Sequence, residues 1–300
     1  MNKSIWFLVL VVCHTIGINS QIHAQLLVAH RGASAEAPEN SLSSFQLAWE
    51  EDADAIEGDF YLTSDEQIVC IHDETTKRVS DVDMKVSNST LEQLQKLDVG
   101  SWKDSQYANE RIPTIQDVLA TIPFGKSFFI EIKCGPEILP ILKPILLDSG
   151  IPLSQLKIIS FDEDVVKVAK QTMPDIETFW VVGFKKDKQQ GKWMPTIDDV
   201  LKTAASINAD GLDLKAELEV INSDVVARCR DAGLGLHAWT VDDPKLAEQL
   251  IEFGFDSVTT NRPGFLRQAL VVSKTEAKQS PVEVPSDEER STTTQAIGKE

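Results

Sequence analysis

Short runs of β-branched and aromatic residues alternate along the chain with longer segments in which apolar residues recur every three or four positions. The first pattern is typical of buried strands and the second of amphipathic helices. The sequence predicts eight strands, over residues 26–30, 55–62, 128–133, 157–161, 178–182, 211–215, 235–241 and 257–260. Regular alternation of strands and helices favours a parallel α/β architecture over separate all-α and all-β blocks.

Helices are expected between these strands, over residues 41–51, 114–121, 138–148, 163–171, 197–206, 223–232 and 244–253, with a last one beginning near Gly264. Several have start signals, such as Asn40 or Ser41 before the first and Asp243 ahead of Pro244. Eight strand–helix units over about 240 residues match the size of a (β/α)8 barrel. We therefore expect an α/β fold, a TIM barrel spanning residues 25–270.

Three segments depart from this pattern. Residues 67–72 predict a short extra strand after the second one, and residues 74–111 form a polar excursion that we interpret as a small insertion in the barrel. Long irregular segments at the catalytic rim of a barrel usually shape a substrate site. Residues 271–300 are rich in polar and charged residues and are expected to form a disordered tail.

The amino terminus has the order of regions of a secretory signal peptide. Lys3 precedes the apolar stretch 5–12, and small or polar residues are reached by Ser20 and Ala24. The apolar part is too short to span a bilayer comfortably. We expect residues 1–24 to be removed, with cleavage after Ala24 or alternatively after Ser20, and the protein to be exported to the periplasm or the extracellular space.

The chain is acidic, with 29 Lys and Arg against 47 Asp and Glu and a formal charge of −18. This charge repels nucleic acid and anionic lipid, so we expect neither nucleic-acid binding nor stable membrane insertion. A local cationic pocket for a small phosphate ester is compatible with it. The sequence gives no indication of the oligomeric state.

Three cysteines follow the predicted leader, at positions 70, 134 and 229, with no paired spacing that would indicate a thiolate metal site. Cys70 and Cys229 lie among apolar residues and are most simply buried small side chains. The sequence does not decide whether two of the three cysteines form a disulfide.

Acidic residues occupy strand positions two apart. Glu57 and Asp59 share one face of the second strand, and Glu131 and Lys133 share one face of the third, so all should point into the barrel. Three buried carboxylates are costly without a partner, and a hard divalent cation, Ca²⁺ or Mg²⁺, would supply one. The alternative is a set of buried salt bridges in which Lys133 and Arg31 neutralise Glu131 and Glu57.

Two histidines lie at strand ends and can serve as general acid and general base near neutral pH. His30 is followed by Arg31 and Gly32, a phosphate-pairing cation and a flexible turn, and His72 begins a polar run. His237 lies deeper in an apolar strand, and we expect a structural role for it.

These residues lie within a longer series of motifs that closely resembles the signature of the glycerophosphodiester phosphodiesterase family. The resemblance runs in the expected order from about residue 26 to residue 266. Its motifs are His30-Arg31-Gly32, Pro38-Glu39-Asn40, Glu57-Gly58-Asp59, His72-Asp73-Glu74, Leu91 to Gly100 with Ile112-Pro113-Thr114, Glu131-Ile132-Lys133, Ser160-Phe161-Asp162, Trp239-Thr240-Val241 and Thr260-Asn261-Arg262-Pro263.

The resemblance implies a TIM barrel that hydrolyses glycerophosphodiesters to glycerol 3-phosphate and an alcohol such as choline, ethanolamine or glycerol. It implies His30 and His72 as general acid and base, and Arg31 and Lys133 on the phosphate. It also implies one divalent cation held by three carboxylates, Glu57, Asp59 and Glu131. The nucleophile is either water or a neighbouring glycerol hydroxyl, which would give a cyclic phosphate first.

Three further residues have smaller implied roles. Trp239 would line the cleft against the glycerol or the leaving group, and its alternative is an ordinary barrel-core aromatic. Glu39 and Asn40 would hold the first loop by hydrogen bonds.

Two other functions compete with this one. A phospholipase D-like or phosphoinositide-type phosphodiesterase on the same barrel would need an apolar or basic membrane-docking surface, which this acidic sequence does not clearly offer. A non-catalytic protein that only captures glycerophosphodiesters would be expected to lack a histidine or a metal carboxylate, and all five are present.

Overall fold

A computed structural model describes residues 26–279, with the backbone alone for residues 273–279. The predicted signal peptide, residues 1–24, and residues 280–300 of the predicted tail lie outside the described residues.

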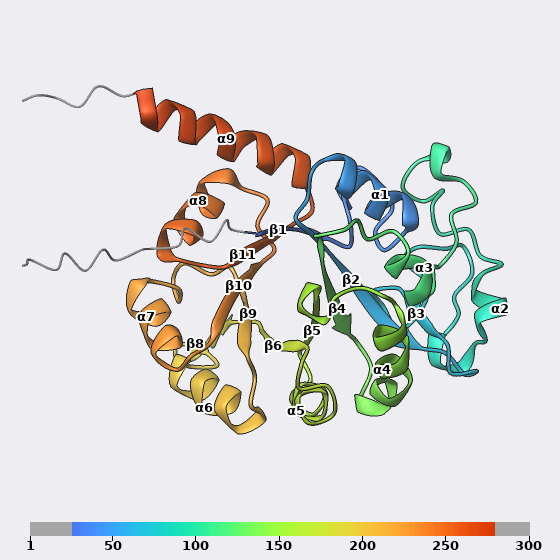
Figure 1. Cartoon of the computed structure of the whole chain (residues 1–300), viewed down its shortest axis with the longest axis horizontal. Helices are drawn as coiled ribbons and strands as arrows, with labels where there is room; N and C mark the ends of the chain where they lie inside the picture. Colours follow the sequence, from blue (N-terminus) through green and yellow to red (C-terminus); the bar gives the residue numbers. More distant parts are fainter. Residues whose placement is uncertain (1–25, 280–300) are drawn as a thin grey trace, which may run out of the picture.

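Eight parallel strands close into a barrel (Figure 1). Each strand pairs with the next one in the series, and β1 pairs with both β2 and β11, which closes the cylinder. The TIM barrel expected from the sequence is confirmed. Its strands are β1 (Leu26–His30), β2 (Ala55–Leu62), β4 (Ser127–Ile132), β5 (Leu156–Ser160), β6 (Glu177–Val182), β9 (Gly211–Lys215), β10 (Gly235–Trp239) and β11 (Ser257–Thr260).

The helices surround the strands, as Figure 1 shows. The expected start signals are used: the Ser41 hydroxyl accepts a hydrogen bond from the Ser44 backbone N–H, and the Asp243 carboxylate accepts one from Leu246. The helices are α1 (Leu42–Glu50), α3 (Ile115–Leu119), α4 (Leu139–Asp148), α5 (Glu163–Thr172), α6 (Ile197–Ile207), α7 (Ser223–Asp231), α8 (Pro244–Phe253) and α9 (Pro263–Gln279). Short 3₁₀ turns precede α4 and β5, namely η3 (Pro136–Ile138) and η4 (Leu153–Gln155).

Apolar side chains fill the space between barrel and helices on one side of each strand and the barrel interior on the other. His237 belongs to the interior. Its ring stacks on Phe179 with centroids 4.1 Å apart, and its Nδ1 lies 2.8 Å from the Ser257 hydroxyl. His237 is thus a buried, hydrogen-bonded residue, as expected.

The insertion after the second barrel strand has a small core of its own. The strand expected near residues 67–72 is β3 (Ile68–Cys70), which pairs antiparallel with β2. Beyond it, η1 (Val86–Asn88), α2 (Leu91–Leu94) and η2 (Ser105–Tyr107) are separated by loops. Buried residues from this segment pack on β3, including Val79, Val86 and Leu94. The insertion is therefore folded, and it packs against β3, the strand that pairs with β2.

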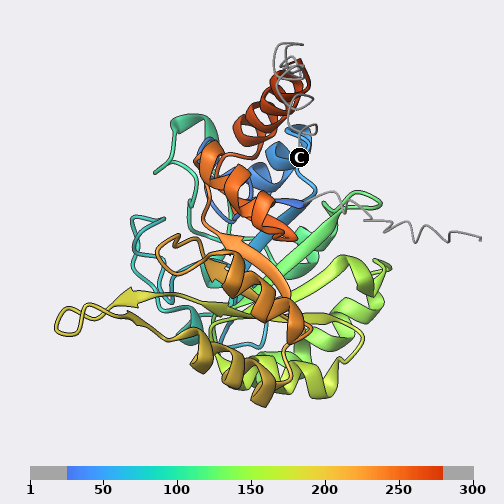
Figure 2. The same ribbon diagram turned by 90° about the vertical axis from the view of Figure 1, so that its left-hand side faces the viewer.

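Two features differ from the sequence expectation. The two-residue strands β7 (Lys185–Lys186) and β8 (Trp193–Met194) form a hairpin that projects from the barrel (Figure 2), and they are too short for a period-two pattern. Helix α9 continues to Gln279, so it extends into residues 271–300, the segment for which the sequence predicts disorder. The low apolar content of residues 271–279 indicates only that this segment forms no core. Its Lys, Glu, Gln and Ala residues are good helix formers, so the segment can continue the helix.

The three cysteines of the described part of the chain are free thiols, with Cys70 and Cys229 buried. The disulfide left open by the sequence is therefore not formed.

Candidate active site

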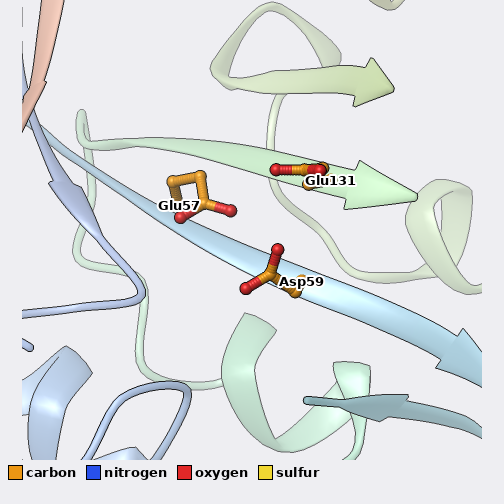
Figure 3. A group of neighbouring side chains, drawn as sticks. All are labelled: Glu57, Asp59 and Glu131. Atoms are coloured by element: carbon orange, nitrogen blue, oxygen red, sulfur yellow. The ribbon is translucent and has the colours of Figure 1, made fainter. Parts of the chain in front are cut away.

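Three carboxylates converge at the carboxyl ends of two neighbouring strands. β2 supplies Glu57 and Asp59, and β4 supplies Glu131, which lies in register with Asp59 (Figure 3). One oxygen from each residue lies within 4.8 Å of the others, and all three side chains are buried. The alternation of side chains along β2 and the parallel register with β4 thus produce the cluster that the sequence predicted.

Lys133 and Arg31 lie against this cluster. Lys133 Nζ is 2.7 Å from Glu131 Oε1 and 3.4 Å from Asp59 Oδ1. Arg31 Nε is 3.1 Å from Asp59 Oδ2, and the Arg31 backbone N–H donates to Glu57 Oε2. The salt-bridge alternative is therefore partly realised. It leaves Glu57 Oε1 buried without a hydrogen-bond partner among the described residues, and Asp59 Oδ1 with an ion pair but no hydrogen bond.

The electrostatics show that two side-chain cations do not balance the cluster. Burial, together with the charges of Asp59 and Glu131, raises the pKa of Glu57 well above its ordinary value. Burial and the Asp59 charge raise the pKa of Glu131 to about 7. Burial also opposes ionisation of Asp59, but Lys133 and Arg31 outweigh it and lower the pKa of that carboxyl. Oxygen ligands with excess negative charge and an unpaired buried atom fit a divalent cation.

His30 is held in one tautomer by the loop after β11. Its Nδ1 lies 2.7 Å from Asn261 Oδ1. The Asn261 amide nitrogen donates to Asp242, so the amide oxygen faces the ring and Nδ1 carries the proton. Nε2 then has a free lone pair, 4.0 Å from Glu57 Oε2. Burial and the Arg31 charge lower the pKa of His30 to about 4, so the ring is neutral at pH 7.

His72 has a different environment. Its Nδ1 lies 2.6 Å from Asp73 Oδ1, and the ring is 30% exposed. Burial lowers the pKa of His72, while the charge of Asp59 and the hydrogen bond to Asp73 act in the opposite direction. The carboxylate on Nδ1 fixes the orientation of the ring and favours its charged form.

Glu39 and Asn40 anchor the first loop by hydrogen bonds, as expected. Asn40 Nδ2 donates to Asp59 at 2.8 Å. Glu39 accepts from Arg31 at 3.1 Å and from Arg78 of the insertion at 2.6 and 2.8 Å. Arg78 also donates to Asp73 at 2.7 Å. The insertion thereby connects the His72 side of the site to Arg31.

A pocket of about 140 Å³ opens between these groups. Trp239 forms part of its wall, with Nε1 donating to the Asp213 carbonyl at 3.1 Å and its ring edge-to-face with Phe161 at 5.4 Å. Asp59 is fully buried and forms ion pairs with Arg31 and Lys133, which line the pocket. The pocket is lined by His30, Arg31, Glu57, His72, Glu131, Lys133, Ile159, Phe161, Val181, Asp213, Trp239 and Thr259. All eight residues predicted for the site are thus brought together.

Several neighbours of the site have no role predicted from the sequence. Asn261 and Asp73 belong to recognised motifs, but only the fold shows which histidine each one contacts. Asp213 carries a usable signal: it is a carboxylate between two leucines in an apolar strand, so its side chain faces the barrel interior.

The comparison with protein families decides what kind of barrel this is. The model of the Glycerophosphoryl diester phosphodiesterase family matches residues 30–265. The chain belongs to this family. Family, fold and enzyme class are therefore as the sequence predicted.

Two glycerophosphodiester phosphodiesterases match the sequence of this chain over most of their own length. A glycerophosphodiester phosphodiesterase of Caldanaerobacter subterraneus subsp. tengcongensis is 32% identical over 243 residues, which cover 79% of this chain and 94% of the relative. One from Bacillus subtilis is 31% identical over 255 residues, covering 79% and 84%.

Solved structures agree with the fold. A phosphodiesterase of Oleispira antarctica, in complex with the product sn-glycerol-3-phosphate, is 27% identical with a TM-score of 0.71, covering 82% of this chain and 96% of that one. The glycerophosphodiester phosphodiesterase of Thermotoga maritima, 22% identical with a TM-score of 0.66 over 82% and 98% of the two chains, has the same fold.

Proposed function

We propose that this protein hydrolyses glycerophosphodiesters to glycerol 3-phosphate and an alcohol with the help of one bound Ca²⁺ or Mg²⁺. The observation that carries the proposal is the convergence of three carboxylates, two cationic side chains and two histidines around one pocket. The product found in the Oleispira antarctica relative supports the same substrate class.

Glu57, Asp59 and Glu131 would hold the cation. A cation held there would withdraw charge from the non-bridging oxygens of the phosphate. Arg31 and Lys133 bring two more positive charges to the same place, Arg31 with a guanidinium suited to paired hydrogen bonds to phosphate. These charges lower the repulsion met by a nucleophile that approaches phosphorus.

The two histidines divide the proton transfers. His30, neutral with a free Nε2, accepts the proton of the attacking hydroxyl, and Asn261 receives the hydrogen bond of Nδ1–H throughout. His72 donates a proton to the oxygen of the departing alcohol, and Asp73 stabilises the ring in its charged form. The same assignment serves attack by water and attack by a neighbouring glycerol hydroxyl. Trp239 packs against the carbon atoms of the substrate.

The test is an assay of protein stripped with chelator on a panel of glycerophosphodiesters, with Ca²⁺ and Mg²⁺ added back separately. We expect loss of hydrolysis, selective recovery with one cation, and release of glycerol 3-phosphate. Full activity in the stripped protein would reject the cation. Faster hydrolysis of lysolipid micelles than of glycerophosphocholine would favour a lipid-cleaving enzyme, and binding without turnover would favour a capture protein.

The proposal extends to the location of the enzyme, outside the cytoplasm, on the basis of the leader-like residues 1–24. No helix in residues 26–279 is long and apolar enough to cross a bilayer. Amino-terminal sequencing of the protein recovered from the periplasm or the medium tests this. A mature start at residue 25 or 21 is expected, and an intact amino terminus in the cytoplasm would contradict it.

A further inference from the structure

One carboxyl group of the pocket has no role in the mechanism above. Asp213 lies on β9 between Leu212 and Leu214, which pack into the layer between barrel and helices, so Asp213 faces the interior. Its side chain lines the pocket and is only 3% exposed. Its Oδ1 has no hydrogen-bond partner within the described part of the chain. A buried carboxyl oxygen without a partner is costly, which points to a ligand that supplies one.

Asp213 lies apart from the cation cluster, the three carboxylates Glu57, Asp59 and Glu131 that would hold the cation. β9 is four places from β2 in a closed barrel of eight strands, so Asp213 lines the pocket from the wall opposite the strand that carries Glu57. The carboxylates whose oxygens group within 4.8 Å are those of β2 and β4, and Asp213 is not among them. The group that pairs with Asp213 is therefore not the cation itself but a part of the substrate across the pocket.

The surfaces around Asp213 indicate the chemistry of that part. Ile159, Phe161 and Val181 and the Trp239 ring give apolar walls. Burial, together with the charge of Glu131, raises the pKa of Asp213 well above its ordinary value, which favours the protonated carboxyl, a group that both donates and accepts a hydrogen bond. A small carbon skeleton that bears a hydroxyl group fits these walls with one polar group among them.

We propose that Asp213 binds a free hydroxyl of the glycerol moiety and thereby selects a glycerol ester over an ester of a less hydroxylated alcohol. The proposal rests on the proposed function, since it places the glycerol of that substrate opposite the cation cluster. It assigns Asp213 to substrate recognition rather than to proton transfer.

The experiment compares phosphocholine esters of glycerol, propane-1,2-diol and propane-1,3-diol, each diol lacking one of the two free hydroxyls. We expect the wild type to prefer the glycerol ester to at least one diol ester by about 10- to 100-fold in kcat/KM. Asp213→Val should abolish this preference by lowering kcat/KM for the glycerol ester alone. Asp213→Asn, which still donates and accepts, should retain it. Asp213→Ala serves as a second variant if the valine protein does not fold.

Val181→Ala is the matched control, because Val181 is the register partner of Asp213 on β6 and lines the same pocket without a polar group. It should change all three esters by a similar factor. Asp213→Asn keeps a polar group of the same size, so its melting temperature should stay close to that of the wild type. Calorimetric Ca²⁺ titration of Asp213→Val should give the wild-type affinity.

The outcomes separate the two proposals. A wild type that hydrolyses none of the esters would reject the proposed function. A wild type that hydrolyses them with a preference unchanged in Asp213→Val, or with all three esters slowed equally, would overturn the role of Asp213 alone. Loss of Ca²⁺ affinity in that variant would also overturn it, by assigning Asp213 to the cation.

Discussion

Nδ1 of His30 lies 2.7 Å from Oδ1 of Asn261, although the two residues are 231 positions apart. Asp242 orients the amide by accepting hydrogen bonds from both the side chain and the backbone of Asn261. The first strand therefore supplies the imidazole, and the loop after the last strand decides which of its nitrogens can accept a proton.

Replacing Asn261 should impair catalysis more than binding. In Asn261→Ala the His30 ring loses the acceptor that fixes its tautomer, and we expect kcat to fall about 10- to 100-fold with little change in KM. The control is Ser34→Ala, which removes the other hydrogen bond to Asn261 Oδ1 and should stay near wild type. Steady-state kinetics on glycerophosphocholine measures both. Normal turnover in Asn261→Ala would contradict the positioning role.

The two histidines should respond differently to the leaving group. Each alanine variant should lose on the order of 10² to 10⁴ in turnover of a choline ester. A p-nitrophenyl ester of glycerol phosphate needs no proton on its departing oxygen, so His72→Ala should recover most of its activity on it. His30→Ala should not recover. Equal defects of both variants on both esters would contradict the division into acid and base.

Cation binding should raise the melting temperature of the folded protein. A cation that binds the folded state alone adds about 2.7 kcal/mol at a concentration 100 times its Kd. We expect Ca²⁺ or Mg²⁺ to raise the melting temperature of the wild type. Glu57→Gln removes one charge from a crowded cluster, so the cation-free variant should melt no lower than the wild type and should respond much less to the cation. A full shift in Glu57→Gln would exclude Glu57 as a ligand.

Acid should destabilise the barrel partly through His237. Burial lowers the pKa of this ring to about 4, whereas the unfolded chain titrates near 6.5. Between these values only the unfolded state binds the proton, so the stabilising contribution is complete above pH 6.5 and falls as the pH drops to about 4. The loss is about 3 kcal/mol.

His237→Gln isolates this contribution, because the other titrating groups are common to both proteins. Urea unfolding at pH 7.5 and pH 4.5 should show a smaller loss of unfolding free energy in the variant than in the wild type. Equal losses would show that His237 does not titrate as its burial implies.

The amino-acid pattern alone was enough to predict the barrel and the residues that line its site. Strand and helix periodicities are local, so they located all eight barrel strands and their helices. Positions two apart on a strand share a face, so spacing alone was enough to place Glu57 with Asp59 and Glu131 with Lys133 in the interior. Family motifs added His30, His72 and the expected chemistry.

The pairing of these groups, in contrast, depends on the folded barrel. It joined His30 to Asn261 and linked Arg78 of the insertion to Glu39. It also left Asp213 Oδ1 without a hydrogen-bond partner among the described residues. Such relations depend on barrel closure and on the path of the insertion, which bring together residues far apart in sequence. Local periodicity specifies the face on which a side chain lies, whereas its partner across the barrel is fixed by register and packing.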